Sequence, residues 1–287
     1  MDNSAVNSIS FFSKDVMTCP VCEAEFHKED IRTGRGRLIA GDLTDELRRF
    51  YEPSQKYGEV NPLLYSVIVC PDCYYAAFQN DFMEISLESV SAIAGDKKKR
   101  FDTIEKLFKE LDFTESRKLK EGTAAYYLAM MSYDHFPHEF SPVIKQGLSS
   151  YRAAWLFMDL HSKYPDENYD YLSKLFYRKA GFFYNLSVEY DSDGTESLTE
   201  VVSLGPDLDK NYGYDGVLYV SALLEYYYGP DSDDLKRIKY LEKARTTVAR
   251  IFGMGKASKN KPEALLTKAK DLHSSIGEEI KRRTKNE

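Results

Sequence analysis

The sequence lacks several features that would place the protein in familiar classes. No apolar run in its 287 residues reaches the roughly 18 needed to cross a membrane. Met1 to Thr18 are polar and contain no basic stretch followed by an apolar one, so we expect no secretory signal, no membrane insertion and a cytoplasmic location. The motifs H-E-x-x-H and G-x-S-x-G are absent, and the five histidines are scattered. We therefore expect no enzymatic activity.

Cysteine is also scarce, but its four copies follow a pattern. They form two matched C-P-x-C turns, Cys19 to Cys22 and Cys70 to Cys73. A tight turn with cysteines three residues apart presents two sulfurs to one ion, and two such turns complete a tetrahedral shell. A closed shell of four sulfurs leaves no position for water, so the ion has a structural role. The spacing predicts structural zinc bound by Cys19, Cys22, Cys70 and Cys73.

Three other interpretations of the cysteines stay open. Iron in a rubredoxin-like shell uses the same ligands, so the sequence does not separate zinc from iron. Either C-x-x-C pair could act as a redox dithiol, although that motif normally opens a helix in a βαβ unit, and no such pattern surrounds Cys19. Disulfides would need an oxidising compartment, which nothing here indicates.

The distribution of charge argues against a nucleic-acid-binding N-terminus. The net charge is −7, and residues 1–80 contain 8 Lys and Arg against 12 Asp and Glu. A zinc centre of four thiolates would add negative charge, which phosphate backbones repel. The C-terminal tail, residues 256–287, is basic, with 9 Lys and Arg against 5 Asp and Glu, and could meet an acidic partner or nucleic acid. The basic run Lys97 to Arg100 is expected to be a solvated helix start.

Hydrophobic periodicity becomes helical from Phe78 to the C-terminus. Before that point we expect a short strand that delivers Cys70, and a helical turn near Asp45 to Tyr51. The predicted fold is mainly α: a small four-cysteine zinc-ribbon-like module at residues 1–77, connecting helices at 78–111, and a tetratricopeptide-like antiparallel helical domain at 112–287. Helices are predicted near residues 78–93, 98–111, 115–135, 142–158, 167–190, 214–228, 232–252 and 262–283, with a long loop at 191–213.

Local signals define several of these helix ends. Ser141-Pro142 predicts an N-cap followed by proline at the first helical position, and Asp231 after Gly229-Pro230 predicts another cap. Small residues at inner positions, such as the alanines, favour tetratricopeptide-type hairpins. An ordinary helical bundle whose alanines allow close packing would show the same pattern, and the full repeat consensus does not align.

Several short sequence segments resemble those of a known family. Cys19 to Phe26, Asn61 to Tyr65, Val67 to Ala77 and Arg152 to Leu156 are similar to the bacterial domain-of-unknown-function 2225 family. The resemblance covers about residues 17 to 250, and the cysteine block and the Asn-Pro-Leu-Leu-Tyr phrase are its most specific parts. It implies a zinc-ribbon-like N-terminus and tetratricopeptide-like helices, and it implies no known activity.

The chain departs from that family beside each metal turn. The family usually has glycine after the second cysteine of each pair, where this chain has Glu23 and Tyr74. Glycine eases the positive φ that lets backbone N–H groups reach the sulfurs. We therefore expect weaker metal binding here.

Aromatic residues are frequent in the helical half, where residues 112–287 contain 17 of the 22 tyrosines and 8 of the 16 phenylalanines. Stacked helix pairs create a concave surface, and tyrosines there offer large contact areas with a polar tip. We expect a protein–protein interaction scaffold that binds an unidentified protein or peptide on its helical surface. A nucleic-acid-associated zinc-ribbon adaptor and a thiol redox protein are the alternatives.

Overall fold

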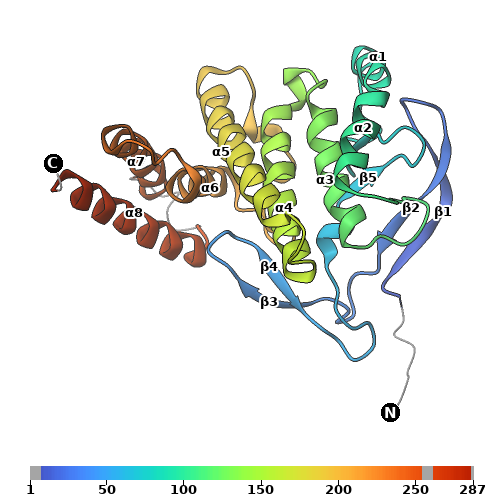
Figure 1. The fold of residues 1–287 in the computed structure, drawn as a ribbon, viewed down its shortest axis with the longest axis horizontal. Coiled ribbons are helices and arrows are strands. Elements are labelled where there is room, and N and C mark those ends of the chain that lie inside the picture. Colours follow the sequence, from blue (N-terminus) through green and yellow to red (C-terminus); the bar gives the residue numbers. More distant parts are fainter. Residues whose placement is uncertain (1–7, 254–260, 286–287) are drawn as a thin grey trace.

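The computed structural model describes residues 8–253 and 261–285 (Figure 1). The N-terminal quarter forms small β-hairpins, and helices follow to the end of the chain. The stretch Gly253 to Ser258 resembles a phosphate loop, but Arg250 and Ala257 stand where that motif needs Gly and Ser or Thr, and the stretch falls almost entirely outside the described residues. Within the described ranges, no helix combines the length and the apolar character needed to span a membrane.

In the part of the chain that the structure describes, six strands pair as three antiparallel hairpins. They are β1 (Ser10–Thr18) with β2 (Glu25–Ile31), β3 (Ile39–Leu43) with β4 (Arg49–Glu52), and β5 (Val67–Val69) with β6 (Ala76–Phe78). The strand predicted to deliver Cys70 is confirmed as β5. The helical turn predicted near Asp45 to Tyr51 is wrong, because that stretch forms the β3–β4 turn, with Leu47 at a φ of +57°, and then β4.

Eight α-helices follow in the described residues, as the periodicity predicted. They are α1 (Leu87–Gly95), α2 (Lys97–Leu107), α3 (Leu119–Tyr133), α4 (Pro142–Lys163), α5 (Tyr169–Asp193), α6 (Gly213–Tyr228), α7 (Asp234–Ala249) and α8 (Glu263–Thr284). From α3 onward each helix contacts the next, and together they form the expected antiparallel array (Figure 1). The specific identity as tetratricopeptide repeats stays a prediction.

Several predicted helix starts differ from the observed ones, and for two of them the structure shows the reason. Helix α1 begins at Leu87 rather than near residue 78, because the preceding stretch first completes β6 and a turn, and Ser86 then caps the helix. The N-cap of α7 is Asp233, not Asp231, since its carboxylate accepts the Lys236 N–H at 3.3 Å. Sequence spacing defines a helix end only to within a few residues.

Ser141 precedes α4, but its side chain does not cap that helix. Its φ is +46°, and its hydroxyl donates instead to the Ser197 carbonyl at 2.8 Å. The N–H of Val143 is accepted by the buried carboxylate of Glu196 at 3.1 Å. The cap therefore comes from the loop between α5 and α6, more than 50 residues away, which local sequence does not indicate.

The hairpins and the helices share one continuous core. Two neighbouring side chains of α3 complete the edge of β6: Ser132 Oγ accepts the Ala76 N–H at 3.3 Å, and Tyr133 Oη accepts the Phe78 N–H at 2.9 Å. Satisfying a strand edge with helix side chains fixes one element against the other. The division of the chain at residues 77 and 111 stays a prediction.

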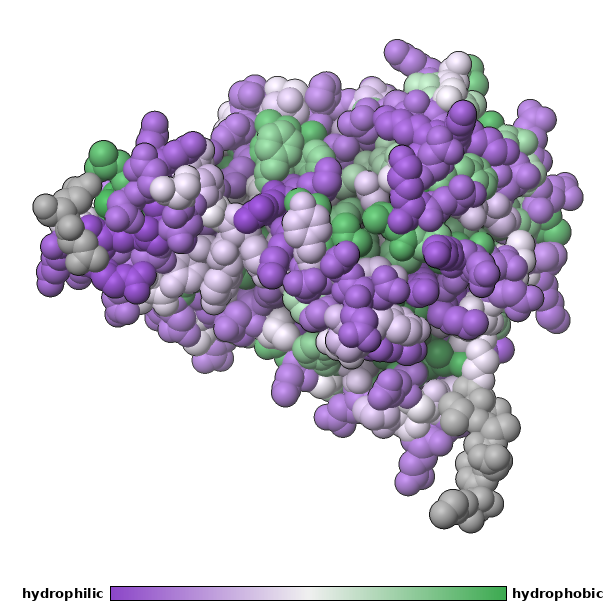
Figure 2. All heavy atoms as spheres, viewed as in Figure 1, coloured by the Kyte–Doolittle hydropathy of each residue, from purple (hydrophilic) through white to green (hydrophobic). Residues whose placement is uncertain are grey.

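The visible surface of the helical array is mostly polar, with separate apolar patches (Figure 2). Figure 2 shows hydrophilic residues over most of the visible face, with hydrophobic ones gathered in patches over α3, α4 and α5. Helices that bury one stripe against their neighbours leave this kind of surface.

Candidate metal centre

Each cysteine pair lies in the turn of its own β-hairpin. The last paired residues before the first turn are Thr18 and Glu25, and Val69 and Ala76 close the second in the same way. Both turns therefore contain six residues, with cysteine at the first and fourth positions. Antiparallel pairing on both sides holds the ends of each turn at a fixed separation, so the cysteine spacing becomes a fixed geometry.

Backbone hydrogen bonds within the turns show how the cysteines are oriented. In the first turn Cys19 N–H donates to the Ala24 carbonyl at 2.9 Å, and Glu23 N–H donates to the Cys19 carbonyl at 2.9 Å. The Val21 N–H points at Cys19 Sγ, 3.4 Å away. The second turn repeats the two backbone bonds at the equivalent positions. Bonds to the sulfur stabilise a thiolate and orient it as a ligand.

The residue after each second cysteine adopts the left-handed backbone that we expected there. Glu23 has a φ of +63° and Tyr74 a φ of +58°. Non-glycine residues seldom adopt this region, so both positions carry some backbone strain. At Tyr74 the side chain offers compensation, because its ring stacks on Phe101 at 4.1 Å between centroids and meets Phe113 edge-on at 5.3 Å.

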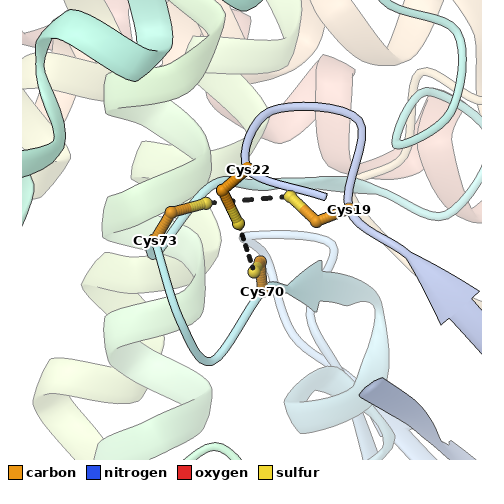
Figure 3. Close-up of side chains that lie close together, drawn as sticks. All are labelled: Cys19, Cys22, Cys70 and Cys73. Atoms are coloured by element: carbon orange, nitrogen blue, oxygen red, sulfur yellow. Dashed lines mark hydrogen bonds between the residues drawn. The ribbon is translucent and has the colours of Figure 1, made fainter. Parts of the chain in front are cut away.

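The four sulfurs form a compact cluster (Figure 3). Cys19 and Cys73 Sγ are 3.7 Å apart, Cys22 and Cys70 Sγ are 3.6 Å apart, and all four lie within 4.8 Å of one another. All four are free thiols rather than disulfides. Sulfurs about 2.3 Å from a central ion at the corners of a tetrahedron would be about 3.8 Å apart. The spacing therefore fits a four-coordinate ion at the centre.

The thiol chemistry also suits a cation. Hydrogen bonds from Cys70 and Cys73 lower the pKa of Cys19 to about 4. The same contacts, together with burial, raise the pKa values of Cys70 and Cys73, because a second thiolate would lie beside the first. Without a cation Cys70 and Cys73 therefore resist deprotonation beside the Cys19 thiolate, whereas a bound metal would favour the thiolate form of its ligands.

A basic side chain from α2 completes the surroundings. Arg100, which is 1% exposed, donates from Nε and Nη2 to the Cys73 carbonyl at 3.2 and 3.0 Å, and from Nη1 to the Ile93 carbonyl at 2.6 Å. Lys97 pairs with Asp72 inside the second turn at 3.1 Å. The expected helix start is confirmed, and Lys97, Lys98 and Lys99 are exposed. Arg100 differs from the expectation, because it is buried and its hydrogen bonds hold the second cysteine turn.

The predicted tyrosine surface is partly occupied by the chain itself. Tyr151 Oη donates to the Glu46 carbonyl at 3.0 Å, Tyr177 Oη to the Glu46 carboxylate at 2.7 Å, and Tyr219 Oη to the Asp45 carbonyl at 2.8 Å. These tyrosines come from α4, α5 and α6, while the acceptors lie in the β3–β4 turn. Three successive helices thus bind one loop of the N-terminal hairpins.

Neighbouring contacts hold the same loop in place. Leu47 is completely buried. Arg48 donates to the Trp155 carbonyl at 3.4 Å and to Asp159 at 2.5 Å. This part of the helical surface is consequently a closed internal contact, and a partner would have to use a different part of the array.

The fold and the cluster define a class of protein: two β-hairpins whose turns assemble a four-cysteine centre, joined to an antiparallel helical array. Within this class the chain belongs to the bacterial family DUF2225, described as "Uncharacterized protein conserved in bacteria", whose pattern matches residues 11–276. It is also 45% identical over 277 residues to an "Uncharacterized protein" of Borreliella burgdorferi, covering 96% of this chain and 99% of that one. No solved structure matches the chain. The resemblance seen in the sequence is confirmed.

Proposed function

We propose that the protein is a non-enzymatic interaction scaffold whose helical array binds a protein or peptide, and whose four-cysteine centre holds one structural zinc ion. The observation that carries the proposal is the position of the cluster. Its second turn is held by Arg100 of α2, and the strand that follows is held by Ser132 and Tyr133 of α3. An ion there would fix both hairpins against the helices.

The donor set supports zinc in a structural role. Four sulfurs leave no ligand position for water or substrate, and zinc in such shells stabilises a fold rather than performing chemistry. Iron uses the same donors, so the metal must be measured. Elemental analysis of protein purified without added metal should give one zinc per chain. A well-folded protein without metal would refute the structural role.

The two alternatives have less support. In a thiol redox protein the nucleophilic sulfur must meet another protein or a small disulfide. Cys19, Cys70 and Cys73 are at most 1% exposed, which leaves only Cys22 in partial contact with solvent. A nucleic-acid adaptor would need a basic surface beside the hairpins, where acidic residues outnumber basic ones.

The scaffold proposal is tested by binding of a purified partner. Affinity capture from native extract with the full chain as bait supplies candidates, and calorimetry with each purified candidate measures stoichiometry. The full chain is needed because the helices and hairpins share one core. We expect one-to-one binding that weakens after zinc is removed. Failure of every purified candidate to bind the zinc-loaded chain would refute the scaffold function.

A further inference from the structure

A cleft with a volume of about 660 Å³ opens beside the first turns of α4. Ser66 and three longer segments line it: residues 78–84 at the end of β6 and beyond, residues 139–152 before and within the first turns of α4, and residues 200–208 in the loop before α6. We call it the α4 cleft. Its volume is within the range of about 300 to 1,000 Å³ typical of ligand sites. Unlike the tyrosine surface, it is not filled by a described loop of the chain.

The floor of the α4 cleft is apolar. Phe78, Phe140, Ile144, Leu148 and Leu208 contribute side chains from all three segments. On its rim Val202 is 74% exposed. Apolar surface bordered by polar residues is typical of grooves that bind ligands or proteins.

The basic groups of the α4 cleft are already engaged. Lys145 forms an ion pair with Asp81 at 2.9 Å. Arg152, which is buried, donates twice to the Pro206 carbonyl at 2.9 and 3.1 Å, and its guanidinium lies 5.8 Å from the centre of the Phe78 ring. Lys145 is therefore neutralised by Asp81, whereas Arg152 keeps its charge but is buried against the Pro206 carbonyl.

The acidic groups on the rim are free. Glu84, Glu139 and Glu200 line the cleft, are exposed, and form no ion pair with any other described residue. Asp207, also in the lining, is paired with Arg49 at 3.5 Å. Three unpaired carboxylates around an apolar floor give this cleft a net negative field, which attracts cations and repels phosphate.

We propose that the α4 cleft docks a short segment of a partner protein in which Lys or Arg side chains flank one or two large apolar side chains. The apolar residues occupy the floor, and the cations meet Glu84, Glu139 and Glu200. Long basic side chains suit both features, because their stems cover apolar surface while their heads reach carboxylates. This inference rests on the proposed scaffold function and specifies its binding site.

The test uses a display library of random 12-residue peptides selected on the full, zinc-loaded chain. We expect enriched peptides to combine basic with large apolar residues. The affinity of one synthesised winner is then measured by fluorescence anisotropy for the triple variant E84Q/E139Q/E200Q. Three exposed carboxylates together raise the affinity for a basic peptide roughly tenfold, so the triple variant should bind the peptide about tenfold more weakly. Its binding should also lose most of its dependence on salt concentration. Val202→Lys, at an exposed position, should also weaken binding.

The matched control neutralises three exposed acids away from the cleft, in E167Q/E242Q/E278Q. It changes the net charge equally and should leave the affinity within about twofold. Equal weakening in both triple variants would show a non-specific charge effect and overturn the inference. If the selected peptides bind the cleft variants as tightly as they bind the parent chain, the α4 cleft is not the docking site. This result would not contradict the scaffold function. If the selection enriches no peptide, the inference that the α4 cleft docks a peptide segment is also wrong. The scaffold function is decided separately, by the test with purified partners.

Discussion

Arg100→Met tests whether the arginine of α2 supports the metal centre. The substitution removes a buried guanidinium that donates three hydrogen bonds, two of them to the Cys73 carbonyl. The Ile93 carbonyl keeps a bond from the Asp96 N–H, whereas the Cys73 carbonyl loses both donors that reach it from α2. An unsatisfied buried acceptor costs about 1–3 kcal/mol, and lost charged hydrogen bonds add a similar amount, so we expect a loss of about 2–4 kcal/mol.

Zinc binding should weaken in the same variant. Groups that orient metal ligands through a second layer of hydrogen bonds typically change affinity by about 10- to 100-fold. Urea unfolding measures the free energy, and competition with a chromogenic zinc chelator measures the affinity. Arg100→Lys separates charge from geometry, because lysine keeps the charge but lacks the planar set of donors.

Lys99→Met is the matched control, since Lys99 is next to Arg100 and exposed, with only a surface pair to Asp96 at 3.1 Å. Its effect should stay within about 0.5 kcal/mol. If Arg100→Met unfolds at the same urea concentration as the parent chain and competes for zinc equally well, the reasoning about this arginine is wrong.

Three further sets of substitutions test other parts of the structure. Gly122→Ala would force its methyl carbon against a side-chain carbon of Leu64, and it should lose about 1–2 kcal/mol in urea unfolding. Gly277→Ala has room and should instead gain up to about 1 kcal/mol, and the reverse order would contradict the packing argument. Burial raises the pKa of Glu225, so the folded chain holds that proton more tightly and loses stability as the pH rises above 4.5. Glu225→Gln should make this decline shallower between about pH 4 and 7, and an unchanged slope in pH-dependent unfolding would count against it. Tyr219→Phe removes a 2.8 Å bond to the β3–β4 turn, should cost about 1 kcal/mol and should speed proteolysis of that hairpin, whereas unchanged cleavage would show that the bond does not hold the turn.

The cluster of four cysteines was predictable because its sequence signal is local. Cysteines three residues apart in a proline-containing turn indicate a ligand pair without any knowledge of the fold. The eight helices of the described residues could also be predicted from the sequence, since apolar residues recur at helical spacing along them. Arg100 was not, because in sequence it is one of four consecutive basic residues, and only the approach of α2 to the second turn distinguishes it from Lys99.

Long-range contacts explain the other differences. Glu196 replaces Ser141 as the cap of α4 because the loop before α6 folds back onto the helix start. Glu46 and Leu47 look like surface residues of a short helical turn, yet three helices bind their loop. The α4 cleft likewise exists only when three distant segments meet, so no single stretch of sequence contains its signal.

The contact between the β3–β4 turn and α6 determines an order of events during synthesis. Both cysteine pairs lie within the first 73 residues, so the two hairpin turns that form the cluster are made early. The hydrogen bond between Tyr219 and Asp45 spans 174 residues, and at synthesis rates of about 5–20 residues per second its two ends are separated by roughly 10–30 seconds. Until α6 emerges, the loop that contains Leu47 has no complete surface to bury it. The nascent chain therefore exposes Leu47 for some time after both cysteine pairs have been made.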